Sequence, residues 1–163
     1  MDASRKRISL HLLLAIPLLV GAVAHAALPQ DKNPLIGTWN ANIEKSKRHP
    51  NHLFKSAKLR FSAANSVITL SYTGVNMSGV EETGNTVFHP DGKEHPLEVM
   101  AGAVEVSRWV NPQKLETVVT QNGKVIGHST YEVSADGRTL TAVLRGTDAS
   151  GAPFEQVIVC DRE

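Results

Sequence analysis

The sequence contains little of what stabilises or activates many small proteins. Cys160 is the only cysteine among 163 residues, so no disulfide bond can form within the chain. Aromatic residues make up 5% of the chain, and 17 basic residues nearly balance 16 acidic ones. Without a basic block or many rings on which bases could stack, we expect no nucleic-acid partner. We expect Cys160 to be buried as a small apolar residue, with pairing between chains as the alternative.

Motifs of covalent or metal-assisted catalysis are also missing. Neither G-x-S-x-G nor S-x-x-K occurs in the sequence. His49 and His52 could bring two imidazoles together in a loop, but a metal site needs a third ligand, and the sequence places none. Glu81 and Glu82 are adjacent, so on a strand they point to opposite faces and cannot act together. We therefore predict no metal site and no cofactor.

Residues 1–26 have the three parts of a secretory signal. Basic residues in "MDASRKRIS" precede the apolar run "LHLLLAIPLLVGAVA", and small residues follow at Ala24 and Ala26. The run is about 15 residues long, short of the roughly 20 that span a bilayer. We predict a signal peptide over 1–26, with an uncleaved membrane anchor as the alternative. The mature chain, residues 27–163, is then one exported domain, periplasmic or secreted, without a stable membrane span. We expect a monomer or a weak homodimer.

From Leu35 onward, short runs rich in Val, Ile and Thr alternate with turn signals, and helical periodicity is nearly absent. Asn122-Gly123 predicts a type I′ hairpin turn, because both residues accept positive φ. Similar signals stand at "AANS", "HPDGK", "NPQK", "ADG" and "DASG". The predicted strands are 35–43, 57–62, 66–72, 78–88, 93–97, 103–110, 114–121, 124–134, 138–147 and 153–161.

Even spacing and tight turns predict an antiparallel meander. So long a meander in a small domain is expected to curl and close, because closure removes exposed strand edges. We therefore predict an all-β fold, a single antiparallel up-and-down β-barrel of about 8–10 strands, with an open sandwich as the alternative. The longest connection, "EKSKRHPNHLF", is rich in Lys, Arg and His. Pro50 excludes a long helix there, whereas one turn over 44–47 would fit.

Two blocks of sequence resemble a known family. "LIGTWNANIEKSK" near the start and "NGKVIGHSTYEVSADGRTLTAVLRGTDASGAPFEQVIVCDRE" at the end are similar to small exported bacterial proteins. Domains of that family begin G-T-W-x-x-N-x-x-x-S-K and end with a DGKTLT…GTDAQG hairpin. By fold the family resembles lipocalins and fatty-acid-binding proteins, which are calycin-type barrels that open with a G-x-W strand. The resemblance implies a lipocalin-like barrel plugged by Trp39, with Gly37 allowing close backbone approach. In lipocalins a cation from the last strand often packs over this tryptophan, and here that strand offers only Arg162, at its end.

The chain departs from fatty-acid-binding proteins where those proteins hold their ligand. Residues 44–53 are too few for the two-helix lid, and the last strand reads "EQVIVC" in place of an Arg-x-Tyr that holds a carboxylate. Arg108 shares a strand face with Val104 and Val106, and pointing inward it would hold an acidic head group. An outward Arg108 on a solvated face is the alternative. The predicted ligand-binding residues are Trp39, Phe61, Tyr72, Arg108, Trp109 and Tyr131.

Three functions remain open at this point. The first is a barrel that binds a small apolar or amphipathic ligand without catalysis. The second is an enzyme, an isomerase, cyclase or hydrolase acting on a hydrophobic substrate through an acid or histidine trapped inside the barrel. The third is an envelope accessory protein with a filled core, which the absence of a cavity of roughly 300 Å³ would indicate. The catalytic candidates, all mid-strand, are Tyr72, His128, Tyr131 and Glu132.

Overall fold

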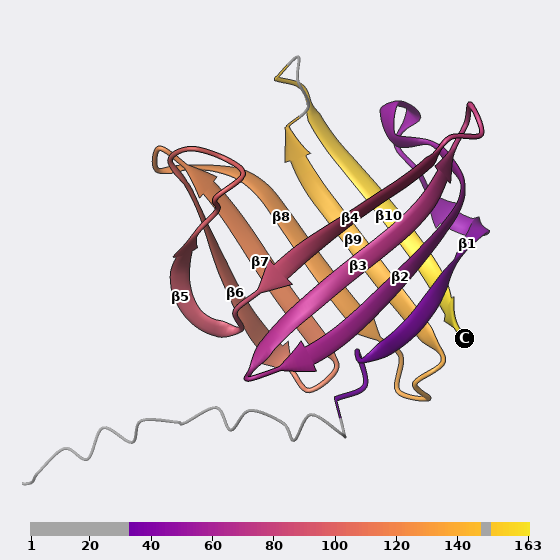
Figure 1. Ribbon diagram of the computed structural model, residues 1–163, viewed down its shortest axis with the longest axis horizontal. Helices are drawn as coiled ribbons and strands as arrows, with labels where there is room; N and C mark the ends of the chain where they lie inside the picture. The colour runs from indigo at the N-terminus through magenta and orange to yellow at the C-terminus, as the bar shows by residue number, and fades with distance from the viewer. Residues whose placement is uncertain (1–32, 148–150) are drawn as a thin grey trace, which may run out of the picture.

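The computed structural model describes residues 33–147 and 151–163 of the chain. Ten antiparallel strands and one short 3₁₀ turn make up these residues (Figure 1). No helix in the described ranges is long and apolar enough to cross a membrane. The predicted signal peptide, residues 1–26, lies outside the described ranges.

The elements are β1 (Gly37–Lys47), η2 (Pro50–His52), β2 (Phe54–Ala64), β3 (Val67–Asn76), β4 (Glu81–Phe88), β5 (Asp91–Pro96), β6 (Ala103–Asn111), β7 (Lys114–Gln121), β8 (Lys124–Val133), β9 (Thr139–Thr147) and β10 (Pro153–Arg162).

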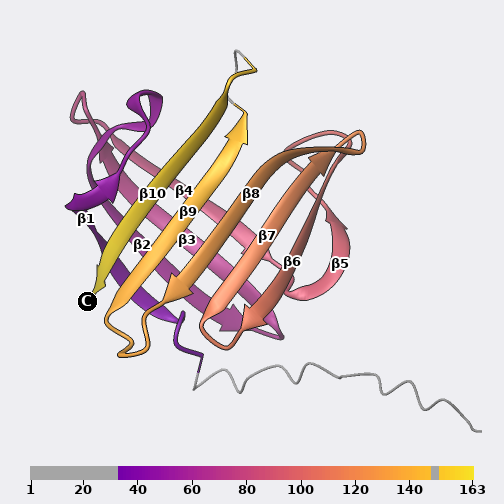
Figure 2. The same cartoon turned by 180° about the vertical axis from the view of Figure 1, so that it is seen from behind.

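The strands form one curled sheet in the order β4-β3-β2-β1-β10-β9-β8-β7-β6-β5. The pairing of β1 with β10 brings the two ends of the domain together, and β6 to β10 lie side by side on one side of the barrel (Figure 2). The all-β, up-and-down, lipocalin-like prediction is confirmed. Closure is incomplete, because β4 and β5 stand at the two ends of the sheet and form no ladder with each other in the described residues.

Local turn chemistry explains why the strands end where they do. Asn122 and Gly123 have φ values of 51° and 77°, as the predicted type I′ turn requires. The connection between β1 and β2 differs from the prediction. β1 continues through a register shift as far as Lys47, so residues 44–47 are strand and form no helical turn. The connection from β1 to β2 contains only the short turn η2, so among the described residues no helical lid covers the end of the barrel where η2 lies.

Large apolar side chains fill one end of the barrel. Trp39 is fully buried near the start of β1, and its indole N–H donates a 3.0 Å hydrogen bond to the Leu35 carbonyl. Cys160 is also fully buried, on the last strand. The other members of this packed end include Leu35, Phe61, Phe88, Leu115, Val133 and Leu140. The closed end therefore supplies most of the core, which leaves the opposite end free to hold a site.

Candidate functional site

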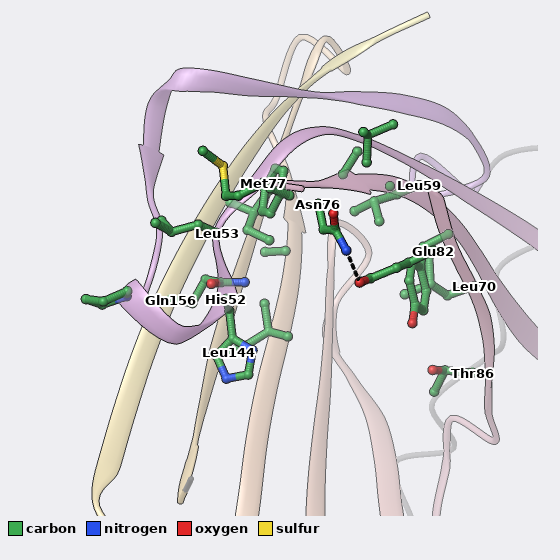
Figure 3. A pocket seen from close by; sticks show the side chains of 18 of the residues that line it. His52, Leu53, Leu59, Leu70, Asn76, Met77, Glu82, Thr86, Leu144 and Gln156 are labelled. Atoms are coloured by element: carbon green, nitrogen blue, oxygen red, sulfur yellow. Dashed lines mark hydrogen bonds between the residues drawn. The ribbon is translucent and has the colours of Figure 1, made fainter. Parts of the chain in front are cut away.

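A cavity of about 790 Å³ lies inside the barrel (Figure 3). Its walls come from β2, β3 and β4 on one side and from β8, β9 and β10 on the other. It reaches the surface beside η2 and the turn between β3 and β4, because Leu53 and Met77 line it and are themselves exposed. Most of its deeper wall is apolar, formed by Leu59, Leu70, Ala142, Leu144 and Ile158. The cavity exceeds the roughly 300 Å³ at which ligand pockets begin, which argues against a filled core.

A cluster of three rings stands beside the cavity mouth. Phe154 lies 5.7 Å from His49 and 5.3 Å from His52, measured between ring centres. The two imidazoles are 5.8 Å apart, as their spacing in the sequence predicts. Gln156 is buried in the cavity wall, and its side-chain oxygen accepts a 3.2 Å hydrogen bond from the His49 backbone N–H. These contacts hold η2 over the mouth. No group of three or more potential metal ligands occurs within residues 33–147 and 151–163.

One hydrogen bond and one ring contact shape the opposite rim. The Asn76 side-chain amide donates a 2.8 Å hydrogen bond to Glu82, which brings the ends of β3 and β4 together (Figure 3). Tyr72 lies across from Gly84, and a Cβ atom at position 84 would stand 2.3 Å from the Tyr72 ring. A glycine is therefore required for the ring to lie flat against β4. The Tyr72 side chain is both exposed and part of the cavity wall.

The structure brings two of the predicted residues, Tyr72 and Tyr131, to the cavity wall. Tyr131 is buried and packs edge-on against Phe61, with ring centres 5.4 Å apart. Burial, reinforced by the nearby charge of Glu105, raises the pKa of Tyr131 to about 12. The phenol therefore stays protonated at neutral pH and acts as a hydrogen-bonding group.

Three other predicted residues lie inside the barrel but apart from the cavity wall. Trp39 and Phe61 fill the closed end, and neither is among the residues that line the cavity. Trp109 packs against the core from the inner face of β6. They support the cavity without forming its surface.

Arg108 points outward, so the prediction of an inward arginine is wrong. Glu105 and Ser107 are buried on β6, and strand alternation places Arg108 on the opposite face, where 66% of its side chain is exposed. Its guanidinium lies 2.6 Å from Glu116. His128 shares that outer cluster, with its Nε2 2.9 Å from the same carboxylate.

Glu132 also lies on the outer surface. Its carboxylate pairs with Lys114 at 2.9 Å, and half of the side chain is exposed. His128 and Glu132 therefore cannot act as acids or bases trapped inside the barrel, because both alternate with the inward-facing Tyr131.

Sequence reasoning missed a buried polar group on β6 and β7, formed by Glu105, Ser107 and Thr117. Only 4% of Glu105 is exposed, and the Ser107 hydroxyl donates a 2.7 Å hydrogen bond to it. Burial raises the pKa of Glu105 despite this hydrogen bond. The signal was present in "AVEVSRWV", where Ala103, Glu105, Ser107 and Trp109 share one strand face. The apolar Val104 and Val106 drew attention to the wrong face.

The curled ten-stranded sheet places the chain in the calycin fold class of fatty-acid-binding proteins and lipocalins. The fluorescent protein UnaG is similar, with a TM-score of 0.52 at 16% identity over 78% of this chain and 96% of that chain. A fatty acid binding protein of Schistosoma mansoni, in complex with arachidonic acid, gives a TM-score of 0.51 at 11% identity over 80% and 96% of the two chains. No family model and no curated protein sequence matches the chain. At these identities the likeness establishes the fold.

Proposed function

We propose that the barrel binds a small apolar or amphipathic molecule without transforming it. The observation that carries this proposal is the 790 Å³ cavity with a mostly apolar deep wall and a mouth at one end of the barrel. The wall is mainly apolar and includes polar side chains such as Asn76, Glu82 and Gln156, a mixture typical of ligand pockets. The Schistosoma mansoni fatty acid binding protein of the same fold is in complex with arachidonic acid.

The titratable groups favour binding over catalysis. Tyr131, the most buried candidate on the wall, has a pKa of about 12 and is poorly matched to proton transfer at neutral pH. Glu132 and His128 lie outside the barrel in ion pairs. The remaining catalytic candidate, Tyr72, lies at the rim against Gly84.

The proposal includes export of the mature chain. The basic start, the short apolar run and the small residues before position 27 support cleavage near Ala26. A carrier released in this way would act in the periplasm or outside the cell. The G-T-W start and the DGRTLT…GTDASG hairpin support membership of a family of small exported bacterial barrels. N-terminal sequencing of the protein from its host tests this part, and an intact residue 1 would contradict it.

Titration with an uncharged fluorophore that brightens in apolar surroundings tests the binding function. We expect saturable binding of one molecule per chain. Leu144→Trp places a large ring in the cavity and should lower the affinity at least about tenfold, since a well-buried apolar contact surface is lost. Val87→Trp, an exposed position on the outer face of β4, is the matched control and should leave binding unchanged. Equal binding by both variants would contradict the proposed site.

A further inference from the structure

The buried Glu105, Ser107 and Thr117 form a polar group on the inner face of the barrel, which we call the interior acid cluster. Ser107 lies opposite Thr117 in the ladder between β6 and β7, and Thr117 lies opposite Ser129 in the ladder between β7 and β8. Three hydroxyl side chains thus form a row across three strands. The row ends next to Tyr131, which follows Ser129 on the same face of β8.

Tyr131 joins the interior acid cluster to the cavity. It lines the cavity, and the charge of Glu105 contributes to its raised pKa, so the two side chains are electrostatic neighbours. The interior of the barrel is therefore amphipathic. An apolar wall from β2, β3, β9 and β10 lines the cavity, and a polar strip on β6 to β8, outside the lining residues, continues along the inner face from Tyr131.

The interior acid cluster has unused capacity to accept hydrogen bonds. A carboxylate has about four acceptor positions, and the structure gives Glu105 one hydrogen bond of normal geometry, from Ser107. A weak hydrogen bond from Thr117 also lowers the pKa of Glu105, but it falls short of normal geometry, and the buried Thr117 hydroxyl has no other partner among the described residues. Buried polar atoms without partners are rare in native proteins. One such atom, on the same inner face of the sheet as the cavity-lining Tyr131, indicates room for a further donor.

The charges around Glu105 do not supply that donor. His95 lies opposite Glu105 in the ladder between β5 and β6, but its ring stacks on His89 at 4.1 Å and its Nε2 lies 3.0 Å from Asp91. Both histidines act on Glu105 only through their charge when protonated. Among the described residues no lysine or arginine forms an ion pair with Glu105. An ionised carboxylate without a cation is unstable in such a place.

The cavity is equally poor in groups that would hold an anionic ligand. The arginines inside strand runs, Arg60, Arg108 and Arg145, are all exposed, and the last two pair with outer-surface carboxylates. Glu82 at the rim adds a negative charge to the lining. A carboxylate ligand would meet acids inside the barrel and no fixed cation deep in its wall.

We propose that the ligand is an amphiphile with a protonated amine, whose apolar part fills the cavity and whose ammonium group binds Glu105, Ser107 and Thr117. This inference rests on the proposed ligand-binding function and specifies the class of ligand. An ammonium group donates up to three hydrogen bonds and cancels the buried charge, and both the free carboxylate oxygen and the Thr117 hydroxyl can accept from it. The exposed apolar rim at Leu53 and Met77 admits the molecule, and Tyr131 lies between its tail and its head.

Displacement of the uncharged fluorophore by dodecylamine, dodecanol and dodecanoate, each below its micellar concentration, tests the inference. The three probes share one tail and differ in the head group. We expect the amine to bind roughly tenfold or more tightly than the alcohol, because one charge-assisted hydrogen bond contributes about that much affinity. The carboxylate should bind most weakly. Glu105→Gln keeps the shape and removes the charge, so it should abolish the preference for the amine while dodecanol still binds.

Two further variants complete the test. Glu132→Gln makes the same chemical change on the outer surface and should keep the preference for the amine. Thr117→Val removes only the unpartnered hydroxyl and should weaken the amine several-fold, which provides a second readout if Glu105→Gln does not fold. Equal affinity of the three probes, or an amine preference that survives both interior changes, would overturn this inference and leave the proposed binding function standing. Failure of the fluorophore and of all three probes to bind would contradict the carrier function as well.

Discussion

The guanidinium of Arg162 lies 4.0 Å from the ring centre of Trp39, so the last strand covers the tryptophan of the first. The same side chain donates hydrogen bonds to the carbonyls of Gly137, Pro34 and Ile36. One residue thus ties together the start of β1, the end of β10 and the turn between β8 and β9. It closes the end of the barrel opposite the cavity mouth.

This relationship also gives the G-x-W spacing a physical reason. Gly37 has a φ of 137°, and a Cβ atom there would stand 2.8 Å from Nη1 of Arg162. A side chain at position 37 would therefore displace the guanidinium from the Trp39 ring. The glycine makes room for the cation, and the tryptophan provides the face on which the cation lies.

Arg162→Ala should destabilise the fold by about 2–3 kcal/mol, through loss of the cation–π contact and of hydrogen bonds from a charged donor. Arg162→Lys keeps the charge but loses the planar fork, so an intermediate loss is expected. Urea unfolding followed by tryptophan fluorescence measures both. Arg138→Ala, an exposed arginine in the nearby turn, is the control. A loss no larger than that of the control would show that the contact does not stabilise the barrel.

Cys160 should not react with thiol reagents in the folded protein. Burial is the main reason that its pKa is raised to about 12, so the reactive thiolate is scarce as well as inaccessible. We expect labelling by a chromogenic disulfide reagent only at urea concentrations that unfold the chain, and no covalent dimer on non-reducing gels. Rapid labelling of the native protein would contradict the burial.

Glu105→Gln should stabilise the ligand-free protein by about 1 kcal/mol at a pH where Glu105 is ionised, because it removes a buried charge that lacks a cation. A carboxyl whose pKa is raised on folding binds its proton more tightly in the folded state. Stability is therefore lost as pH rises from the unfolded pKa through the folded one. Below the unfolded pKa of Glu105, where the carboxyl is protonated in both states, the variant should be no more stable than the wild type. His89 and His95 face the same carboxyl and lower its pKa through their charge.

Glu116→Gln should show the opposite pH dependence. Hydrogen bonds from His128, and then from Arg108, hold the pKa of Glu116 below its usual range. A depressed pKa stabilises the fold above the unfolded pKa, and this contribution is lost as pH falls through the folded value. The variant should be slightly less stable than the wild type at pH 7 and equal to it in acid. The same slope for both glutamine variants would contradict the assignment of one glutamate to the interior and the other to the surface.

The number of strands was predictable because each turn is specified by residues that are neighbours in the sequence. Asn122-Gly123 and Asp136-Gly137 specify backbone angles that depend on few distant contacts. The role of Trp39 as a plug was predictable from the local G-x-W pattern, whereas the cation over it was not, because Arg162 reaches the ring through the pairing of β10 with β1. The extension of β1 to Lys47 was not, because it depends on pairing with β10 across the whole chain.

The sequence pattern of β6 could not predict which of its two faces points into the barrel. Val104 and Val106 are apolar and point outward, whereas Glu105 and Ser107 are polar and point inward, so the usual alternation is inverted. The hydrophobic pattern normally fixes the face, and here a buried polar group overrides it. Arg108 was therefore placed on the wrong side, and the interior acid cluster was missed.

Native mass spectrometry of the protein purified from its own host tests the central claim, that the cavity carries a small molecule, most directly. We predict a mass above that of the polypeptide by one discrete ligand, which is released on denaturation and remains unchanged after incubation. Leu144→Trp, purified in parallel, should lack it. Bare polypeptide in both samples, or the same adduct on both, would contradict the account.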